Sequence, residues 1–216
     1  MVRQTLHLRY IWYDCASMNG SGSSGQSGRR LTDDWARVVD TAMCAYQQED
    51  RASVSVNAIC TLAKVSKPSL YRAFGSEDGL TAAVLERYEQ VLWDSVEAVL
   101  ASPTTYGDKL DAMIGFASED PRMVSGCLYV KMRATRSRFG LQTQARIAAV
   151  ESRLLDRYAC FFREAGLLGA WRGGINAELA AEYLHEQIGL AFTQRAAGKS
   201  SAYVRELLAL AMLVLR

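Results

Sequence analysis

The segment KVSKPSLYRAFGS, residues 64–76, gathers cations and hydroxyls and contains no acidic residue. Ser66 followed by Pro68 is typical of a helix start, because a serine oxygen caps free amides and proline fits the first turn. Such a helix end directs free amides and positive potential at a phosphate group. Hydroxyl and ammonium groups add donors for phosphate oxygens, and a cation on the exposed face could read guanine. The segment therefore predicts a nucleic-acid contact made by Ser66, Lys67, Ser69, Tyr71 and Arg72.

The elements that must position this segment are three short helices near the N-terminus. The first begins near LTDDWARVVDTAMCAYQ, where Thr32 is the expected cap. The second spans residues 56–63 after a Ser55 cap. Its inward residues are Val56, Ile59, Cys60 and Ala63. A tight turn leads to the third helix, whose Leu70 and Phe74 point into a shared core. Two helices joined by so short a turn predict a helix-turn-helix unit.

The rest of the chain favours helices throughout. Half of its 216 residues are apolar and only three are prolines, and no long alternation of β-branched residues suggests a sheet. The segments with helical spacing of apolar residues are 77–100, 107–118, 124–138, 141–165, 177–197 and 202–215. The predicted fold class is therefore all-α. We expect a helix-turn-helix domain over residues 29–76 and a larger helical domain over residues 77–216.

The last two helical segments are unusually apolar. Residues 177–197 are apolar over more than half of their circumference, and residues 202–215 are apolar on nearly every side. A helix that is apolar all round must be buried all round. Two arrangements satisfy this requirement: a partner subunit covers the outer face, or the last helix lies at the centre of one subunit. We expect the first, a homodimer through residues 177–215, because a small domain has a limited interior.

Composition argues against several other classes of protein. The formal net charge is only +2, so nucleic-acid binding must rest on the local cations. The five cysteines form no CxxC pair and the chain has two histidines, so neither a zinc site nor a disulfide framework is predicted. No Gly-rich phosphate loop or nucleophile elbow is visible. We therefore predict no enzyme activity, no catalytic residues, no metal and no cofactor.

The N-terminal residues 1–28 are predicted to lie outside the fold. Residues 19–28, NGSGSSGQSG, are a Gly/Ser run of the kind that forms flexible coil. Residues 1–17 are interpreted as a mis-called start or a tail, and Arg29 with Arg30 as an arm over DNA or a solvated pair. No signal peptide is recognisable, and no apolar stretch approaches the ~20 residues of a membrane span. A cytoplasmic protein without a membrane partner is expected.

The stretch SVNAICTLAKVSKPSLYRAFGSEDGL, residues 55–80, resembles the DNA-binding helix-turn-helix of the tetracycline-repressor (TetR) family. The matching positions are Ile59, Cys60, Ala63, Val65, Ser66, Leu70, Tyr71, Phe74, Ser76 and Leu80. The SGCL run at 125–128 and the apolar last helices resemble the ligand-binding half of many members. The resemblance implies an all-helical homodimer whose third helix enters the major groove of double-stranded operator DNA. It also implies that a small molecule bound in the larger domain lowers operator affinity.

Matched position by position, the resemblance assigns DNA contacts to Ser55, Lys67, Pro68, Ser69 and Tyr71. Three positions depart from the family pattern, and the mildest is Cys60, where an alanine is usual. Lys64 stands where the turn glycine is usual, and a non-Gly residue with positive φ costs of order 1 kcal/mol. Glu77 stands where a lysine is usual, which reverses the charge of one phosphate contact. Lys64 is also counted among the DNA contacts, because its ammonium group could restore part of that attraction.

An effector pocket is expected among residues 84–190, lined by apolar or aromatic residues with a few polar tips. The candidates are Tyr88, Met113, Phe116, Cys127 and Tyr158, each of which could instead be ordinary core. Residues 122–138 hold several cations and no acid. This basic segment indicates either an anionic effector or arginines that are solvated or paired between helices. The identity of the effector is not predicted.

Two functions follow from these patterns. The leading hypothesis is a DNA-binding transcriptional regulator, a repressor released from its operator by a small-molecule effector. The alternative is a ligand-binding or protein-interaction dimer with a weakened DNA-binding head, which the departures at Lys64 and Glu77 motivate.

Overall fold

The computed structural model describes residues 27–48, 54–121 and 124–216. All regular elements in these ranges are helices and none is a strand, which confirms the predicted all-α class. The helices are α1 (Ser27–Gln48), α2 (Val56–Ala63), α3 (Lys67–Phe74), α4 (Glu77–Leu100), α5 (Tyr106–Glu119), α6 (Leu128–Ala134), η3 (Arg136–Arg138), α7 (Leu141–Leu167), α8 (Ala177–Ala196), α9 (Ser201–Ala211) and η4 (Met212–Leu215). The interpretations of residues 1–17, and nearly all of the predicted extension, lie outside the described residues.

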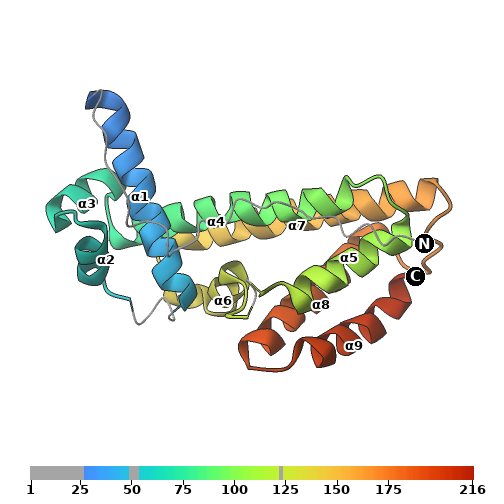
Figure 1. Ribbon diagram of the computed structural model, residues 1–216. Coiled ribbons are helices and arrows are strands. Elements are labelled where there is room, and N and C mark those ends of the chain that lie inside the picture. The colour runs from blue at the N-terminus through green and yellow to red at the C-terminus, as the bar shows by residue number, and fades with distance from the viewer. Residues whose placement is uncertain (1–26, 49–53, 122–123) are drawn as a thin grey trace.

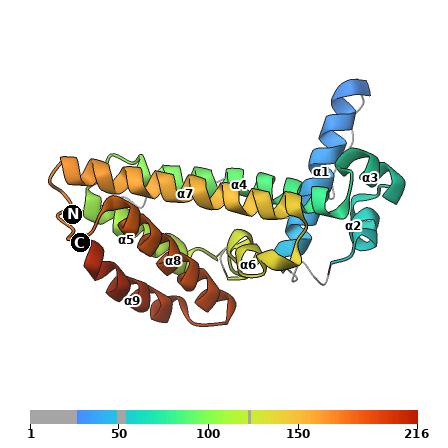
Figure 2. The same cartoon turned by 180° about the vertical axis from the view of Figure 1, so that it is seen from behind.

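Two long helices, α4 and α7, run side by side along most of the molecule (Figures 1 and 2). α1, α2 and α3 gather at one end of this pair, whereas α5, α8 and α9 lie around the other end, with α6 in between. Buried apolar residues form one cluster that extends from Leu70 in α3 to Leu208 in α9. The two ends of the molecule are therefore joined by continuous packing.

The three N-terminal helices pack as the sequence predicts. Leu70 is fully buried, and the half-buried Phe74 meets Trp35 of α1 edge-on, with ring centroids 5.7 Å apart. The guanidinium of Arg37 donates to the carbonyl of Ala63 at the end of α2, at 3.0 Å. The four residues predicted to face inward from α2 are all buried: Val56, Ile59, Cys60 and Ala63.

Asp78, in the first turn of α4, ties the two long helices together near α3. The residue before α7, Gly140, has no side chain that could cap that helix. The Asp78 carboxylate replaces the cap, because it accepts from the backbone amides of Gln142 at 2.9 Å and Thr143 at 3.3 Å. A carboxylate at a helix N-terminus is also favoured by the helix dipole. The start of α4 is thus anchored to the larger half of the molecule.

The first helix is longer than predicted. α1 begins at Ser27 rather than near Thr32, so Thr32 lies inside the helix and is not its cap. Arginine and leucine are good helix formers, and the run RRL extends the helix toward the N-terminus. Arg29 and Arg30 accordingly belong to the first turns of α1.

Two later predictions of helix extent are also wrong. The segment predicted as one helix over 124–138 instead contains two short helices, α6 and η3. Before α6, Gly126 turns the backbone with φ +82°. The last helical segment divides into α9 and η4 at Met212. In both cases the apolar pattern is right, but it does not reveal where the backbone turns.

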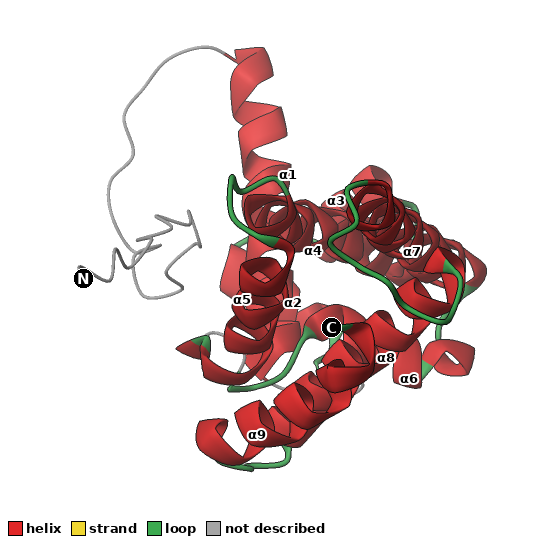
Figure 3. Cartoon of the chain, turned by 90° about the vertical axis from the view of Figure 1, so that its right-hand side faces the viewer, coloured by secondary structure: helices red, strands yellow, loops and turns green. Residues whose placement is uncertain are grey.

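The last helix lies at the edge of the subunit (Figure 3). Val204 and Leu208 are buried, but Leu210, Leu213 and Val214 are 65%, 59% and 61% exposed. The arrangement with a central last helix is therefore wrong. Within the described ranges, none of the helices combines the length and apolar character needed to cross a membrane.

The cysteines are not all in the same state. Cys60 and Cys127 are buried free thiols, and Cys160 is a half-buried free thiol. Cys44 is disulfide-bonded, although the spacing of the cysteines gives no reason to expect a disulfide.

Candidate functional site

The turn between α2 and α3 is held by local hydrogen bonds. Ser55 caps α2 by accepting from the amide of Ala58 at 3.1 Å. At the other end of α2, the amide of Lys64 bonds the carbonyl of Thr61 at 3.3 Å, and the amide of Val65 bonds that of Cys60 at 3.0 Å. This pair of bonds is a Schellman motif, which requires a left-handed residue. Lys64 supplies it with φ 55°, as the sequence predicts.

Lys64→Gly separates the two roles of this position. We expect the free energy of unfolding to rise by about 0.5–1 kcal/mol, because relief of the left-handed strain exceeds the added entropy of the unfolded chain. We also expect the slope of log K against log salt for DNA binding to fall by about one for each subunit. Denaturation and fluorescence anisotropy measure the two effects. Lys64→Ala is the control, since it removes the charge and keeps the strain. A less stable Lys64→Gly protein would contradict this account.

The start of α3 presents a hydroxyl donor to solvent. The Ser66 oxygen accepts from the amide of Ser69 at 3.3 Å, and its proton goes to the Ser69 oxygen at 2.8 Å. Because the Ser69 oxygen already accepts this proton, its own O–H is left to donate outward. Ser69 rather than Ser66 is therefore the better donor for a phosphate.

The remaining predicted contacts lie together on the outer face of α2 and α3. Lys67, Pro68 and Arg72 are exposed, and Tyr71 is 36% exposed. The Lys67 ammonium lies over the Tyr71 ring, 5.8 Å from its centroid, which orients both side chains on one surface. Ser55 and Lys64 are exposed as well. The structure thus brings all eight predicted residues to the surface of the helix-turn-helix unit.

The presence of Glu77 can be explained without assigning it to the DNA-binding surface. Glu77 is the first residue of α4. The cap of this helix is Ser76, whose hydroxyl oxygen accepts from the amide of Gly79 at 3.0 Å. An acidic residue in the first turn of a helix stabilises that helix through its dipole. Helix stability therefore accounts for Glu77 without any role in DNA binding.

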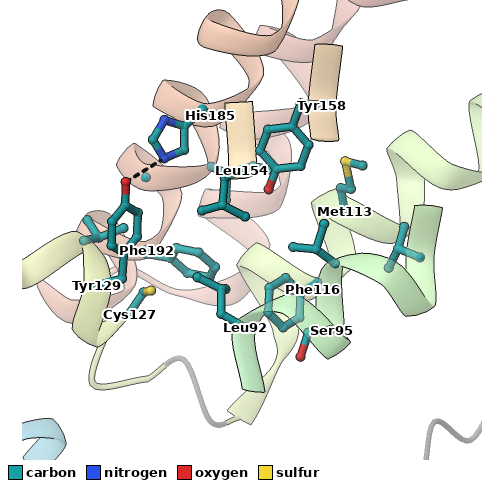
Figure 4. A pocket seen from close by; sticks show the side chains of 15 residues that line it. Leu92, Ser95, Met113, Phe116, Cys127, Tyr129, Leu154, Tyr158, His185 and Phe192 are labelled. Carbon is teal, nitrogen blue, oxygen red and sulfur yellow. Dashed lines mark hydrogen bonds between the residues drawn. The ribbon is translucent and has the colours of Figure 1, made fainter. Parts of the chain in front are cut away.

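A second candidate site is a buried cavity in the larger half (Figure 4). Its free volume is about 30 Å³, which is room for about one water molecule. Four of the five predicted pocket residues line it: Met113, Phe116, Cys127 and Tyr158. The fifth, Tyr88, lies behind Cys127 and donates to its sulfur at 3.3 Å, so it supports the wall of the cavity.

Sequence reasoning missed three prominent residues of this wall: Tyr129, His185 and Phe192. Tyr129 is on α6, and the other two are on α8. The hydroxyl of Tyr129 and Nε2 of His185 are 3.3 Å apart. A histidine on a helix that is apolar over more than half of its circumference was the sequence signal for this pair, since a buried histidine needs polar partners.

Arg133 of α6 connects this histidine to the surface. Its guanidinium is 3.3 Å from Nδ1 of His185, and it donates to Glu151 at 3.0 Å and to Glu186 at 2.7 Å. Burial, and then the charge of Arg133, lower the pKa of His185 below its usual value. The imidazole is therefore neutral at pH 7. The ligand atoms of Glu151, His185 and Glu186 lie within 4.8 Å of one another, but Arg133 already bonds to all three residues, so they fit a guanidinium and not a metal ion.

The basic segment over residues 122–138 is largely committed to the fold. Arg133 is paired with two carboxylates, and the Lys131 ammonium donates to the carbonyl of Gln47 at the end of α1, at 3.3 Å. Arg136 and Arg138 are exposed, and neither lines the cavity. These four residues therefore fit the interpretation of paired or solvated cations. The interpretation of an anionic effector finds no free cation among the side chains that line the cavity.

Comparison with known protein families matches the helix-turn-helix part of the chain. Residues 38–84 match the family of bacterial regulatory proteins of the tetR type. The match contains α2 and α3 whole, the second half of α1 from residue 38 and the start of α4 up to residue 84. No curated protein matches the chain.

Solved structures extend the similarity to the whole fold. NemR of E. coli, in its reduced form, is 18% identical with a TM-score of 0.76, over 85% of this chain and 98% of that one. The regulatory protein TetR from Rhodobacter sphaeroides is 18% identical with a TM-score of 0.75, over 85% and 99%. A regulator from Saccharomonospora viridis in complex with choline is 17% identical with a TM-score of 0.71, over 84% and 96%. At these identities the likeness concerns the fold.

Proposed function

Through its N-terminal domain the chain belongs to the tetR family of bacterial regulatory proteins, and on this premise we propose that it is a repressor whose operator binding is released by a small molecule. The general role, DNA-binding transcriptional regulation, is the role of this family. The similar solved structures named above are regulators and not enzymes. The observation that carries the proposal is the exposed face of α2 and α3. It combines outward hydroxyls and cations at the positive end of the α3 dipole, all of which suit a phosphate backbone.

The DNA contacts fall into two groups. Ser55, Ser66, Pro68 and Lys64 lie at helix ends and the turn, where they shape the unit that meets the phosphates. Lys67, Ser69, Tyr71 and Arg72 lie on the outer face of α3, where the first three donate to phosphate oxygens and Arg72 reaches the base edges of a major groove. A regulator of this kind acts on the chromosome, so we expect the protein in the cytoplasm.

The proposed homodimer forms through α8 and α9. The aliphatic side chains that these elements and η4 leave exposed are Leu179, Leu190, Leu210, Leu213 and Val214, and Tyr203 of α9 is exposed beside them; we call the five aliphatic residues the outer apolar face. Exposed apolar patches of this kind are typical of interfaces in stable assemblies. A second copy of the chain would cover the outer apolar face and set the spacing of two α3 helices, as a two-fold operator requires.

The proposed effector site is the cavity between α4, α5, α6, α7 and α8. Two contacts support a link from this cavity to the DNA-binding end. α6 contributes Cys127 and Tyr129 at its start, and its Lys131 reaches the last turn of α1. Asp78 anchors the start of α4 to α7, whose Leu154 and Tyr158 also line the cavity. A molecule that moves α6 or α7 would therefore displace α1 or α4. The choline complex of one similar structure supports a small-molecule effector for this fold.

The experiment is selection of genomic DNA fragments bound by the purified full-length protein, followed by anisotropy titrations of the enriched sequence. We expect a short palindromic operator, bound far more tightly than shuffled DNA of the same length. Addition of cell metabolite extract should release that operator. If no fragment is enriched even at low salt, the alternative of a dimer with a weakened DNA-binding head is the better description.

A further inference from the structure

The cavity wall carries no charged side chain. None of its lining residues is Asp, Glu, Lys or Arg. Its polar groups are Ser95, Cys127, Tyr129, Tyr158 and His185, set among aliphatic and aromatic side chains (Figure 4). Any ligand of this cavity must therefore be recognised through neutral hydrogen-bonding groups.

The proton of Tyr129 can be located from its neighbours. A guanidinium only donates, so Nδ1 of His185 must accept from Arg133. The single proton of the neutral ring is then on Nε2, which donates to the Tyr129 oxygen at 3.3 Å. The Tyr129 hydroxyl thus accepts from His185, and its own proton remains available for a ligand.

Tyr158 offers a second free hydroxyl. Its side chain is only 4% exposed, and Figure 4 shows the hydroxyl pointing inward among the lining side chains. No hydrogen bond joins it to another described residue. Of the other polar groups of the wall, Ser95 donates to the carbonyl of Val91 at 3.0 Å, and Cys127 accepts from Tyr88 and has only a weak S–H donor left. Burial also raises the pKa of Tyr158, so both tyrosines are donors at neutral pH.

Charged ligands find no counter-ion here. Of the two nearby cations, Arg133 is already balanced by Glu151 and Glu186, and an anion in the cavity would compete with both. Lys131 lines the neighbouring cleft and not the cavity, and its ammonium donates to the carbonyl of Gln47. A cation would meet aromatic faces alone, whose attraction of about 2 kcal/mol is smaller than the several kcal/mol lost on desolvation.

A neighbouring surface cleft provides the route and the extra volume. This cleft, of about 410 Å³, shares Cys127, Val130 and Phe192 with the cavity. These three side chains form the wall between cleft and cavity. The Phe192 ring is held by an edge contact to Phe116, with centroids 5.8 Å apart. A ligand larger than water must move this wall, which lies on α6 and α8.

We propose that the cavity binds an uncharged, largely apolar molecule with a hydrogen-bond acceptor such as a carbonyl oxygen, which the Tyr129 and Tyr158 hydroxyls bind. The inference rests on the proposed function only for the statement that this molecule is the effector. Binding pairs the two free donors, and the apolar remainder displaces Phe192 toward the cleft.

The test uses four probes that share a benzene ring: acetophenone, ethylbenzene, benzoate and benzylammonium. Each is titrated calorimetrically at neutral pH against the full-length protein. We expect acetophenone to bind about 25-fold more tightly than ethylbenzene, because each of the two hydrogen bonds contributes about fivefold. Benzoate and benzylammonium should bind at least tenfold more weakly than acetophenone. Equal or tighter binding of either ion, no preference for acetophenone over ethylbenzene, or no binding of any probe would overturn the inference.

The Tyr158→Phe variant tests whether the Tyr158 hydroxyl causes the preference for acetophenone over ethylbenzene. Because this hydroxyl has no partner among the described residues, its removal leaves nothing unpaired and the protein should fold normally. We expect the advantage of acetophenone over ethylbenzene to shrink about fivefold, with ethylbenzene affinity unchanged. Tyr203→Phe, at an exposed tyrosine of α9, is the control and should change neither affinity. An unaltered preference in Tyr158→Phe contradicts the assignment.

Operator binding without any probe is measured on the same samples. If the acetophenone preference holds but no operator is found, the proposed function fails and the assignment of the cavity stands. If operator binding holds and the preference is absent, only the ligand class is wrong.

Discussion

Lys67→Ala and Tyr71→Ala are each expected to weaken operator binding by about a hundredfold while the protein stays folded. A hydrogen bond to a charged group contributes about 1.5 kcal/mol, close to tenfold in affinity. Each dimer carries two copies of α3, so one substitution removes two such contacts. Both side chains are exposed, and substitutions at such positions change the free energy of unfolding by less than about 0.5 kcal/mol.

The salt dependence distinguishes the two variants. Loss of Lys67 removes a cation, so the slope of log K against log salt should fall by about 0.9 for each subunit. Loss of the Tyr71 hydroxyl should lower affinity and leave that slope nearly unchanged. Lys199→Ala is a matched control, because this exposed lysine lies in the turn between α8 and α9, away from α3. If Lys67→Ala and Tyr71→Ala both keep the operator affinity and the salt slope of the wild type, α3 is not the DNA-binding element.

Leu210→Glu is expected to convert the proposed dimer into a folded monomer. Leu210 is 65% exposed in the isolated subunit, so a carboxylate there remains hydrated and the subunit is unaffected. In the dimer the same carboxylate would be buried without a partner, at a penalty of several kcal/mol for each copy. Light scattering should show half the wild-type mass. Operator affinity should fall by at least a hundredfold, because a single head loses the effective concentration supplied by its partner.

The matched control for this substitution is Leu141→Glu. Leu141 is 83% exposed at the N-terminus of α7, away from the outer apolar face, and a carboxylate at that end of a helix is favourable. This variant should keep both the mass and the operator affinity of the wild type. A dimeric Leu210→Glu protein, or a monomeric wild type, would show that the outer apolar face has another occupant.

The elements that sequence reasoning predicted best are those built by local interactions. Ser55 and Ser66 cap helices three residues away from the amides they accept, and Pro68 occupies the first turn of α3. The left-handed backbone of Lys64 follows from a turn of fixed length between two helices. Helix ends without such signals were predicted poorly, as at α6 and α9, because several backbone conformations suit the same apolar pattern. At α1 the local signal itself was misleading, since Thr32 lies inside a helix that begins at Ser27.

The cavity illustrates the opposite case. Met113, Phe116, Cys127 and Tyr158 were predicted from residue type alone, yet Tyr88, of the same type, lies behind the wall. Residue type does not tell which side of a packed helix faces an opening. That depends on how α4, α5, α6, α7 and α8 rotate against one another in the folded chain.

By itself, the sequence determined the all-α class and the helix-turn-helix head with its cations and hydroxyls, because caps, turns and apolar spacing act over a few residues. Only the tertiary structure decided what the basic segment does and what the cavity can bind. Arg133 meets Glu151 and Glu186 from two other helices and leaves His185 neutral, and this pairing depends on contacts between residues far apart in the chain. The charge that suggested an anionic ligand is thereby balanced, and two tyrosine hydroxyls remain to bind a neutral one.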